Sequence, residues 1–454
     1  MGELPYRPAY GTEGKVVALY SNYFEMKTNP EFVMHRYHIA IVPVAYAPDD
    51  PAKNQSGASE AEETAPTGKS LSNIVRLLLE CSPYAEHQAY LVTDFASTLL
   101  SCQKLTLDVT GWEKSIKYRK ATYRLRLEER GTIDTSHLIE CLNPAAMVES
   151  SAGKEPLLQA LNIILGHLAK SSERTTVYGS NRSFAWDQDF APSSLGTGLV
   201  AMKGFYSSVR AATSRIVINV NVTNGPFYQA EPLHRLMDDL VAANNNVWDV
   251  PTVEAFLKGL QVDVLYLRGK TNQMGRPISC RRTIFGFAKK GDGIAPNSGV
   301  PASSDSQPPP RLSGPWPDHG AGAKNVKFFC TTDGPTPANS AKGQASGGAY
   351  ISVFDYVKKQ YQIELKRVDA DDLPVVNVGN REHPTYIPAE LCTVVPAQYL
   401  RSRLTIGQAQ RMEQFAIRMP YENADWIVRQ GANTIGLTSQ INPKLVSSRG
   451  DFDL

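Results

Sequence analysis

The chain has 454 residues, enough for about three domains of ordinary size. A hydrophobic fraction of 42% supports ordinary buried cores, and a net charge of only +2 excludes a partner recognised by overall charge. The six cysteines include no Cys-x-x-Cys pair, which favours a reducing, intracellular setting and argues against a standard zinc module. The longest apolar run, residues 39–47, is too short to span a membrane, so we expect no membrane role.

The first part of the chain alternates strand and helix patterns. Residues 15–47 contain two β-rich runs, and apolar spacing predicts a helix over 71–81. Between them, residues 48–70 are rich in small and charged residues and are predicted to be a disordered insertion. Strand signals resume at residues 89–95 and 118–129.

The middle of the chain continues this mixed pattern. A helix is predicted over residues 155–170, where Glu155 and Pro156 suit a first helical turn. Strands are predicted at 198–210, 214–222, 262–269 and 281–290, and two helices fall within 231–260.

A second stretch, residues 291–325, is rich in Gly, Pro and Ser and is also predicted to be a disordered insertion. After this stretch, short strands are predicted before and after one helix, and the last part of the chain is predicted to be helical. The strands are expected at 326–330, 363–368 and 373–379, and the helices at 351–362, 404–419 and 421–430. The fold class is therefore predicted to be α+β, with several domains.

A search for catalytic motifs finds no GxxxxGK phosphate loop, no HExxH and no GxSxG. His35 and His38 lie on a predicted strand and point to opposite faces, so they are interpreted as structural and not as shared metal ligands. The acidic run Asp369, Asp371 and Asp372 leaves a metal nuclease open as a minor alternative to a solvated turn. We predict no catalytic residue, no metal and no cofactor.

Residues 264–291 carry seven lysines and arginines and no acidic residue. Phe285 and Phe287 lie among these charges, and further aromatic residues follow. Bases stack on aromatic rings while cations meet phosphates, so the combination suits the ends of single-stranded nucleic acid. A solvated basic face remains the alternative interpretation.

Residues 379–396 place Tyr386 between Pro384 and Pro388. Each proline fixes φ and removes a backbone donor, so the segment is predicted to be extended and excluded from the interior of a sheet. The tyrosine then either covers the edge of a core or forms a platform for a ligand.

The sequences VFDYVKKQYQIELK (353–366) and LPVVNVGNREHPTYIPAELCTVVPAQ (373–398) strongly resemble the PAZ domain of eukaryotic Argonaute proteins. Residues 7–26 resemble the start of the Argonaute N domain, and residues 157–233 contain motifs similar to the first linker. Dicer enzymes also contain a PAZ domain, but the N-domain and linker motifs match Argonaute.

The resemblance implies a domain map. It comprises an N domain (1–142), linker 1 (143–230), a PAZ domain (231–397) and the start of linker 2 (398–454). The PAZ domain is expected to be a small, partly open, OB-like β-barrel with an inserted β-hairpin and helix, which clamp the 3′ end of a guide RNA.

The resemblance also implies which residues bind the RNA 3′ end. They are Arg281, Arg282, Phe328, Phe329, Tyr356, Tyr361, His383, Tyr386 and Ile387. Tyr356 and Tyr361 match the tyrosines that hold the terminal phosphate and sugar, and Arg281 matches a phosphate-contacting position. Thr283 stands where many members of the family have a tyrosine, and His383 stands where a lysine is common. The resemblance therefore implies that this site has one hydroxyl contact and one positive charge fewer than theirs.

No MID or PIWI domain is recognised, so this chain is not expected to be an enzyme by itself. The expected partners are a small guide RNA, the MID and PIWI part of the protein, and other silencing-complex proteins. The N domain is implied to assist strand separation in RNA silencing, and the expected location is the cytoplasm, with the nucleus also open. The rival interpretation is a protein-interaction or dominant-negative module with a degenerate RNA pocket.

Overall fold

The structure is a computed structural model. It describes residues 14–15, 17, 21–27, 32–44, 65–107, 112–118, 121–136, 154–172, 174–179, 181–185, 192–212, 215–269, 280–294, 308–312, 320–330, 349–367 and 373–437. The chain forms two compact units. The first unit comprises residues 1–190, 203–224 and 418–454, and the second unit comprises residues 191–202 and 225–417.

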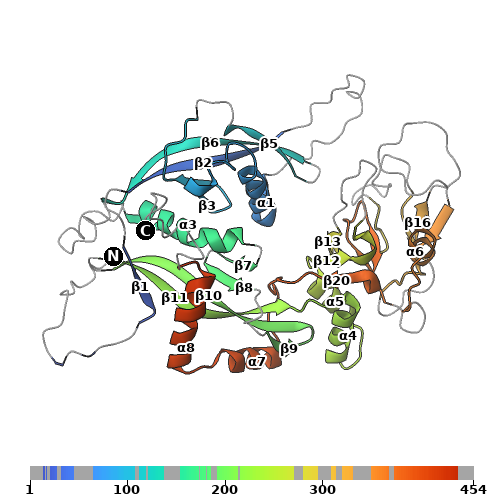
Figure 1. Cartoon of the computed structure of the whole chain (residues 1–454). Helices are drawn as coiled ribbons and strands as arrows, with labels where there is room; N and C mark the ends of the chain where they lie inside the picture. Colours follow the sequence, from blue (N-terminus) through green and yellow to red (C-terminus); the bar gives the residue numbers. More distant parts are fainter. Residues whose placement is uncertain are drawn as a thin grey trace, which may run out of the picture. The chain divides into compact units, whose positions relative to one another are not determined.

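An antiparallel sheet of order β3-β4-β2-β6-β5 opens the first unit (Figure 1). Its strands are β2 (Val33–Val44), β3 (Leu91–Thr93), β4 (Thr98–Ser101), β5 (Lys114–Tyr118) and β6 (Ala121–Asp134). Helix α1 (Gly68–Leu79) packs on one face, where Ile74 and Leu78 meet Tyr37 and Leu125 in a buried cluster. The strand predicted over 118–129 is in fact the end of β5 and most of β6, paired as a hairpin.

A β-bulge in β6 switches the face of the sheet to which its apolar side chains point. His35 pairs with Thr132 but Tyr37 pairs with Glu129, so β6 has one extra residue at this point. Gly131 adopts φ +99° there, a conformation that favours glycine. Because of the bulge, Ile133 joins a different core from Leu125 and Leu127.

The core that Ile133 joins is formed jointly by two sheets and a helix, and we call it the shared core. It includes Met34, Leu100, Ile133, Leu161 and Phe205. It lies between the first sheet, helix α3 (Lys154–Ser171) and a second sheet. The second sheet has the order β1-β11-β10-β8-β7, with β9 paired to β10. Its strands are β1 (Tyr23–Met26), β7 (Thr175–Tyr178), β8 (Arg182–Ala185), β9 (Ser193–Gly196), β10 (Leu199–Ala212) and β11 (Arg215–Tyr228).

The second unit combines short helices with three small antiparallel sheets, of order β13-β12-β20, β14-β18-β19 and β15-β16-β17. The strands are β12 (Gln261–Val264), β13 (Arg281–Thr283), β14 (Gly286–Phe287), β15 (Arg311–Leu312), β16 (Val326–Cys330), β17 (Ala349–Ser352), β18 (Val375–Asn377), β19 (Tyr386–Pro388) and β20 (Cys392–Val394). The helices are α4 (Leu233–Ala243), α5 (Val250–Leu257) and α6 (Val353–Tyr361), with 3-10 turns η2 (Gln88–Tyr90) in the first unit and η4 (Leu265–Leu267) and η5 (Ala389–Leu391) in the second.

Three strand predictions need correction in this unit. The predicted strand 262–269 ends at Val264 and continues as the 3-10 turn η4, and the predicted strand 281–290 splits into β13 and β14, which belong to different sheets. The predicted strand 363–368 is not a strand over its described residues. Lys366 and Arg367 donate their backbone N–H groups to the Glu390 carboxylate, so these donors are not available to a neighbouring strand.

The prediction of disorder for residues 291–325 is wrong for the residues that the structure describes. Arg311–Leu312 form β15, which pairs with β16. Asp292, Ala321 and Ala323 are buried. Of the other predicted insertion, residues 48–64 lie outside the described residues, while α1 already begins at Gly68.

The tail is helical, as predicted, but interrupted. Helix α7 (Ile406–Ala416) ends before Pro420, where α8 (Pro420–Trp426) begins. A π-helical turn, η6 (Ile427–Gly431), and α9 (Ala432–Thr434) follow. Among the described residues, no helix combines the length and apolar character needed to cross a membrane. The predicted α+β class is confirmed.

Candidate functional site

Four aromatic rings meet in the second unit, where α6 lies beside β16 (Figure 1). The Phe328 ring centroid is 5.1 Å from that of Tyr356, the Tyr356 centroid is 6.1 Å from Tyr361, and the Tyr361 centroid is 4.3 Å from Tyr266. We call these four residues the tyrosine cluster. Each ring is only partly buried, so the cluster keeps surface that a ligand can contact.

Helix α6 holds two of the rings. The Ser352 hydroxyl caps the helix by accepting the Asp355 backbone N–H at 3.0 Å. Val353 and Val357 are buried in the core, and Tyr356, three residues after Val353, lies at the edge of this buried face. Tyr361 is the last residue of the helix, one position before Gln362 turns the chain with φ +56°.

Strand β16 separates the two phenylalanines predicted for the site. Successive side chains of a strand point to opposite faces, and Phe328 meets Tyr356. Phe329 instead contacts the Tyr350 ring, with centroids 5.6 Å apart, and the Arg311 guanidinium lies 4.0 Å from the same tyrosine ring. The structure therefore brings Phe328, but not Phe329, into the tyrosine cluster.

Burial and mutual proximity control the hydroxyl groups of the cluster. Burial raises the pKa of Tyr356, and the neighbouring Tyr361, which shares a hydrogen bond with it, raises this pKa further. Burial also raises the pKa of Tyr266, and the charge of Arg282 opposes this effect. The Tyr266 and Tyr356 hydroxyls therefore stay protonated at neutral pH and can donate hydrogen bonds to an anionic oxygen.

The two predicted arginines differ in their surroundings. Arg281 pairs with Asp263 across the strands, with Nε 3.3 Å from Oδ1, and its side chain is 54% exposed. Arg282 lies next along β13 and is the cation whose charge acts on Tyr266. Arg281 is thus engaged with Asp263, whereas the charge of Arg282 acts on Tyr266 of the tyrosine cluster.

Tyr386 begins β19, the edge strand of its sheet, where flanking prolines are tolerated. Its hydroxyl donates to the Asp292 carboxylate at 2.7 Å, and its ring packs against the same core as Phe328. The next residue, Ile387, is 2% exposed and belongs to the core on the other side of the strand. Tyr386 therefore packs against the same buried core as Tyr266 and Phe328, while Ile387 contributes packing and no exposed surface.

A tight turn sets the position of Tyr386. The buried Asn377 side chain accepts the backbone N–H groups of Gly379 at 2.9 Å and Thr385 at 3.1 Å. His383 lies exposed in this turn, and its backbone N–H donates to the Asn380 side chain. The turn thus fixes the start of β19, while the imidazole of His383 faces solvent.

Asp292 is buried beneath Tyr386, and burial raises the pKa of its carboxyl group against the opposing effect of the Tyr386 hydrogen bond. The folded state holds this proton more tightly than the unfolded chain does. The resulting stability is fully present below the unfolded pKa, near 4, and is lost as pH rises through the folded pKa.

We therefore expect the unfolding free energy of the parent, relative to Asp292→Asn, to fall as pH rises from about 4 towards neutral. Asparagine cannot ionise but keeps an oxygen that accepts from Tyr386. Urea unfolding at a series of pH values measures the difference. A difference that stays constant across this range would show that Asp292 titrates alike in both states.

Sequence reasoning missed Tyr266 and Asp292. Tyr266 lies in η4, within a segment predicted as continuous strand, and Asp292 lies in a stretch predicted to be disordered. The one local signal was the pair of glycines around Asp292, which adopt φ +99° at Gly291 and +78° at Gly293 and form a tight turn.

The metal alternative has no support among the residues that the structure describes, since these contain no group of three or more His, Cys, Asp or Glu side chains able to hold a metal ion. Asp369, Asp371 and Asp372, the acidic run considered for magnesium, lie outside the described residues.

Three family profiles match the chain. The N-terminal domain of argonaute matches residues 15–165, the Argonaute linker 1 domain matches residues 179–229, and the PAZ domain matches residues 330–414. Tyr356, Tyr361 and Tyr386 lie within the last match. The N domain, linker 1 and PAZ domain, in this order, are the arrangement of the Argonaute class of proteins.

Relatives with known names agree with this class. Protein argonaute of Schizosaccharomyces pombe is 22% identical over 429 residues, which cover 94% of this chain and 42% of the relative. Protein argonaute 14 of Oryza sativa subsp. japonica is 21% identical over 426 residues, covering 93% of this chain and 33% of the relative. The crystal structure of Kluyveromyces polysporus Argonaute with a guide RNA matches 96% of this chain and 44% of that chain, at 15% identity and a TM-score of 0.53, which shows likeness of fold.

The chain belongs to the Argonaute family, as its sequence motifs predicted. The matches to the N domain and to linker 1 decide between Argonaute and Dicer, the two groups that the PAZ motifs alone left open. The chain spans less than half the length of the curated relatives named above.

Proposed function

We propose that the tyrosine cluster binds the 3′-terminal nucleotide of a small guide RNA, and that the chain acts as a small-RNA-binding module in RNA silencing. The observation that carries this proposal is the meeting of three tyrosines and Phe328 beside Arg282 in the unit that includes the PAZ match. The related Kluyveromyces protein was solved with a guide RNA, which supports RNA as the ligand.

The chemistry of the cluster suits an RNA end. The hydroxyls of Tyr266 and Tyr356 are neutral donors for phosphate or ribose oxygens, and Arg282 supplies a guanidinium for a phosphate. Phe328 offers a ring on which an unstacked base can lie. Tyr386 packs against the same core as Tyr266 and Phe328, and its hydroxyl donates to Asp292.

The proposed activity is binding and includes no bond cleavage. For the first unit, the resemblance of the N domain to its family supports a role in separating the two strands of an RNA duplex. The partners proposed are the guide RNA, the rest of the Argonaute protein and silencing-complex proteins.

A direct test compares two labelled RNA duplexes that differ only in a 3′ overhang. We expect the purified chain to bind the overhang duplex more tightly than the blunt one, because a paired terminal base cannot leave its stack to enter the cluster without an unstacking cost. Fluorescence anisotropy gives both affinities, and gel electrophoresis should recover the RNA intact.

Equal affinity for the two duplexes, or no binding at all, would favour the rival protein-interaction module. The ion pair between Arg281 and Asp263 favours this rival, because it occupies an arginine that was predicted to contact the RNA phosphate. Guide-directed cleavage products would contradict an activity limited to binding.

A further inference from the structure

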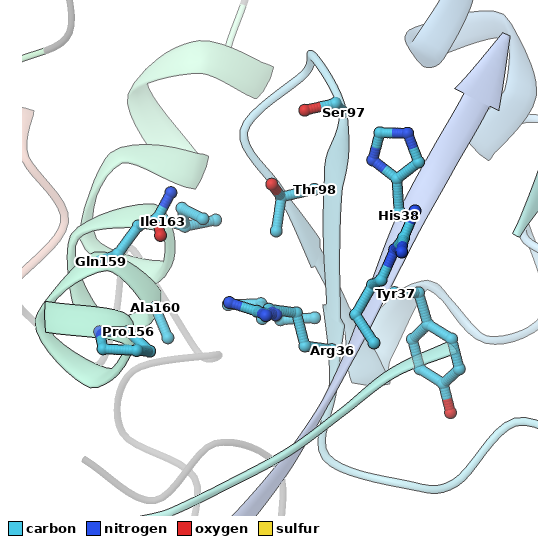
Figure 2. Close-up of a pocket in the computed structure, with 11 residues that line it drawn as sticks. Arg36, Tyr37, His38, Ser97, Thr98, Pro156, Gln159, Ala160 and Ile163 are labelled. Carbon is cyan, nitrogen blue, oxygen red and sulfur yellow. The ribbon is translucent and has the colours of Figure 1, made fainter. Parts of the chain in front are cut away.

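A second place in the chain has the features of an anion site. A cavity of about 260 Å³ lies in the first unit between the sheet and the N-terminal turns of α3 (Figure 2). Its lining includes Arg36 and His38 of β2, Arg130 of β6, and Pro156 and Gln159 of α3. The lining contains three basic side chains and no carboxylate.

The backbone aims these basic groups at the cavity. Arg36 and His38 are two residues apart on β2, so they share one face of the sheet. Arg130 comes directly before Gly131, where the β-bulge of β6 lies. In Figure 2 the Arg36 side chain extends from β2 towards the turn of α3 that carries Pro156 and Ala160.

The charges around the cavity do not cancel. Arg126 and Arg130 both pair with Glu128, at 2.8 and 2.9 Å, so two guanidinium groups share one carboxylate. Arg36 is only partly exposed and has neither an ion pair nor a side-chain hydrogen bond within the described part of the chain. The two arginines that line the cavity, Arg36 and Arg130, therefore have one partner carboxylate between them, that of Glu128, and it is shared with Arg126.

The simplest alternative is that the arginines lie with their stems on apolar surface and their charged ends in water. That explanation fits Arg126 and Arg130, whose side chains are 63% and 53% exposed. It fits Arg36 poorly, because this guanidinium points into a concave space closed on one side by a helix.

The same helix adds to the preference for an anion. The first turn of a helix carries partial positive charge, and Pro156 of that turn lines the cavity together with Gln159, Ala160 and Ile163 further along α3. Glu155 on the first turn lines a separate groove with Tyr206 and Arg210, so its carboxylate does not belong to this cavity. Forked guanidinium groups match the oxygens of a phosphate better than they match a halide.

We propose that this cavity binds a phosphate group, supplied either by the backbone of an RNA strand or by a small phosphate compound. Arg36 is the main ligand, Arg130 the second, and His38 and Gln159 supply further polar contacts. The site lies in the first unit and does not rest on the function proposed for the tyrosine cluster.

The test uses the full chain, with inorganic phosphate as the probe at constant ionic strength. We expect phosphate to bind by isothermal titration calorimetry and to slow hydrogen exchange in segments 36–38 and 156–163. Arg36→Gln should weaken phosphate binding about tenfold or more, as expected when a charge-assisted hydrogen bond is lost. The matched control is Arg124→Gln, which removes an exposed arginine of β6 that pairs with Glu113 at 3.3 Å and does not line the cavity.

A short single-stranded RNA is then tested in a Tyr356→Ala background, which removes the contribution of the tyrosine cluster. Protection of the same segments by this RNA would identify the RNA backbone as a source of the phosphate, whereas protection by inorganic phosphate alone would identify small phosphate compounds. If Arg36→Gln does not fold, judged by circular dichroism and melting, Arg130→Gln serves as the second variant. The proposal is overturned if the parent binds no phosphate, or if the folded variant binds it as tightly as the parent and the Arg124→Gln control.

Discussion

Replacing Tyr356 by alanine should weaken binding of an RNA with a free 3′ overhang by ~1–3 kcal/mol, or about five- to a hundredfold, the range for removing an aromatic ring that stacks on a base. Tyr356 lies in the middle of the tyrosine cluster, between Phe328 and Tyr361. Its loss therefore removes a ring and a hydroxyl donor together. Fluorescence anisotropy against the parent measures the change.

The conservative substitution Tyr356→Phe separates the ring from the hydroxyl. It keeps the ring and should cost less than alanine, about 0.5–1.5 kcal/mol for one ordinary hydrogen bond. Tyr350→Ala is the matched control, because Tyr350 lies beside Phe329 on the other side of β16. If folded Tyr356→Ala binds overhang RNA as well as Tyr350→Ala and the parent do, the assignment of the tyrosine cluster fails.

Replacing Gly379 by alanine should destabilise the turn before β19 by about 1–3 kcal/mol or more, since overpacked sites that cannot relax give costs of this size. A Cβ atom at this position would lie 2.2 Å from the His383 carbonyl oxygen and 2.9 Å from the Thr385 backbone nitrogen. Both neighbours are backbone atoms of the same turn, so neither can move without shifting Tyr386. Urea unfolding should show the loss of stability, and overhang RNA should bind more weakly.

Gly407→Ala provides the control for this substitution. Gly407 lies in α7 with open space around it, so alanine there should stabilise the chain by roughly 0.5–1 kcal/mol through better helix propensity. If Gly379→Ala unfolds at the same urea concentration as the parent and binds RNA equally well, the turn does not position Tyr386.

The sequence allowed the parts of the site that depend on local patterns to be predicted. The helix predicted over residues 351–362 is observed as α6, so Tyr356 and Tyr361 could be placed on one short element. The prolines around Tyr386 likewise predicted an extended segment outside the interior of a sheet, and it forms an edge strand.

Contacts between distant segments could not be predicted in this way. Tyr266 reaches Tyr361 only because β12 ends early in a 3-10 turn, and Asp292 meets Tyr386 across 94 positions in sequence. Low apolar content suggested disorder for 291–325. Small residues such as Ala321 and Ala323 nevertheless bury completely where a helix and a strand pack above them.

The shared core has a consequence for how the first unit folds and unfolds. Met34, Leu100 and Ile133 of the first sheet pack in one buried cluster with Leu161 of α3 and Phe205 of β10. A fragment ending before α3 would leave those three side chains against water, and a fragment beginning at α3 would lose the other wall of the same core. We therefore expect the first sheet, α3 and the second sheet to unfold as one cooperative unit, whose slowest amide hydrogens should exchange together.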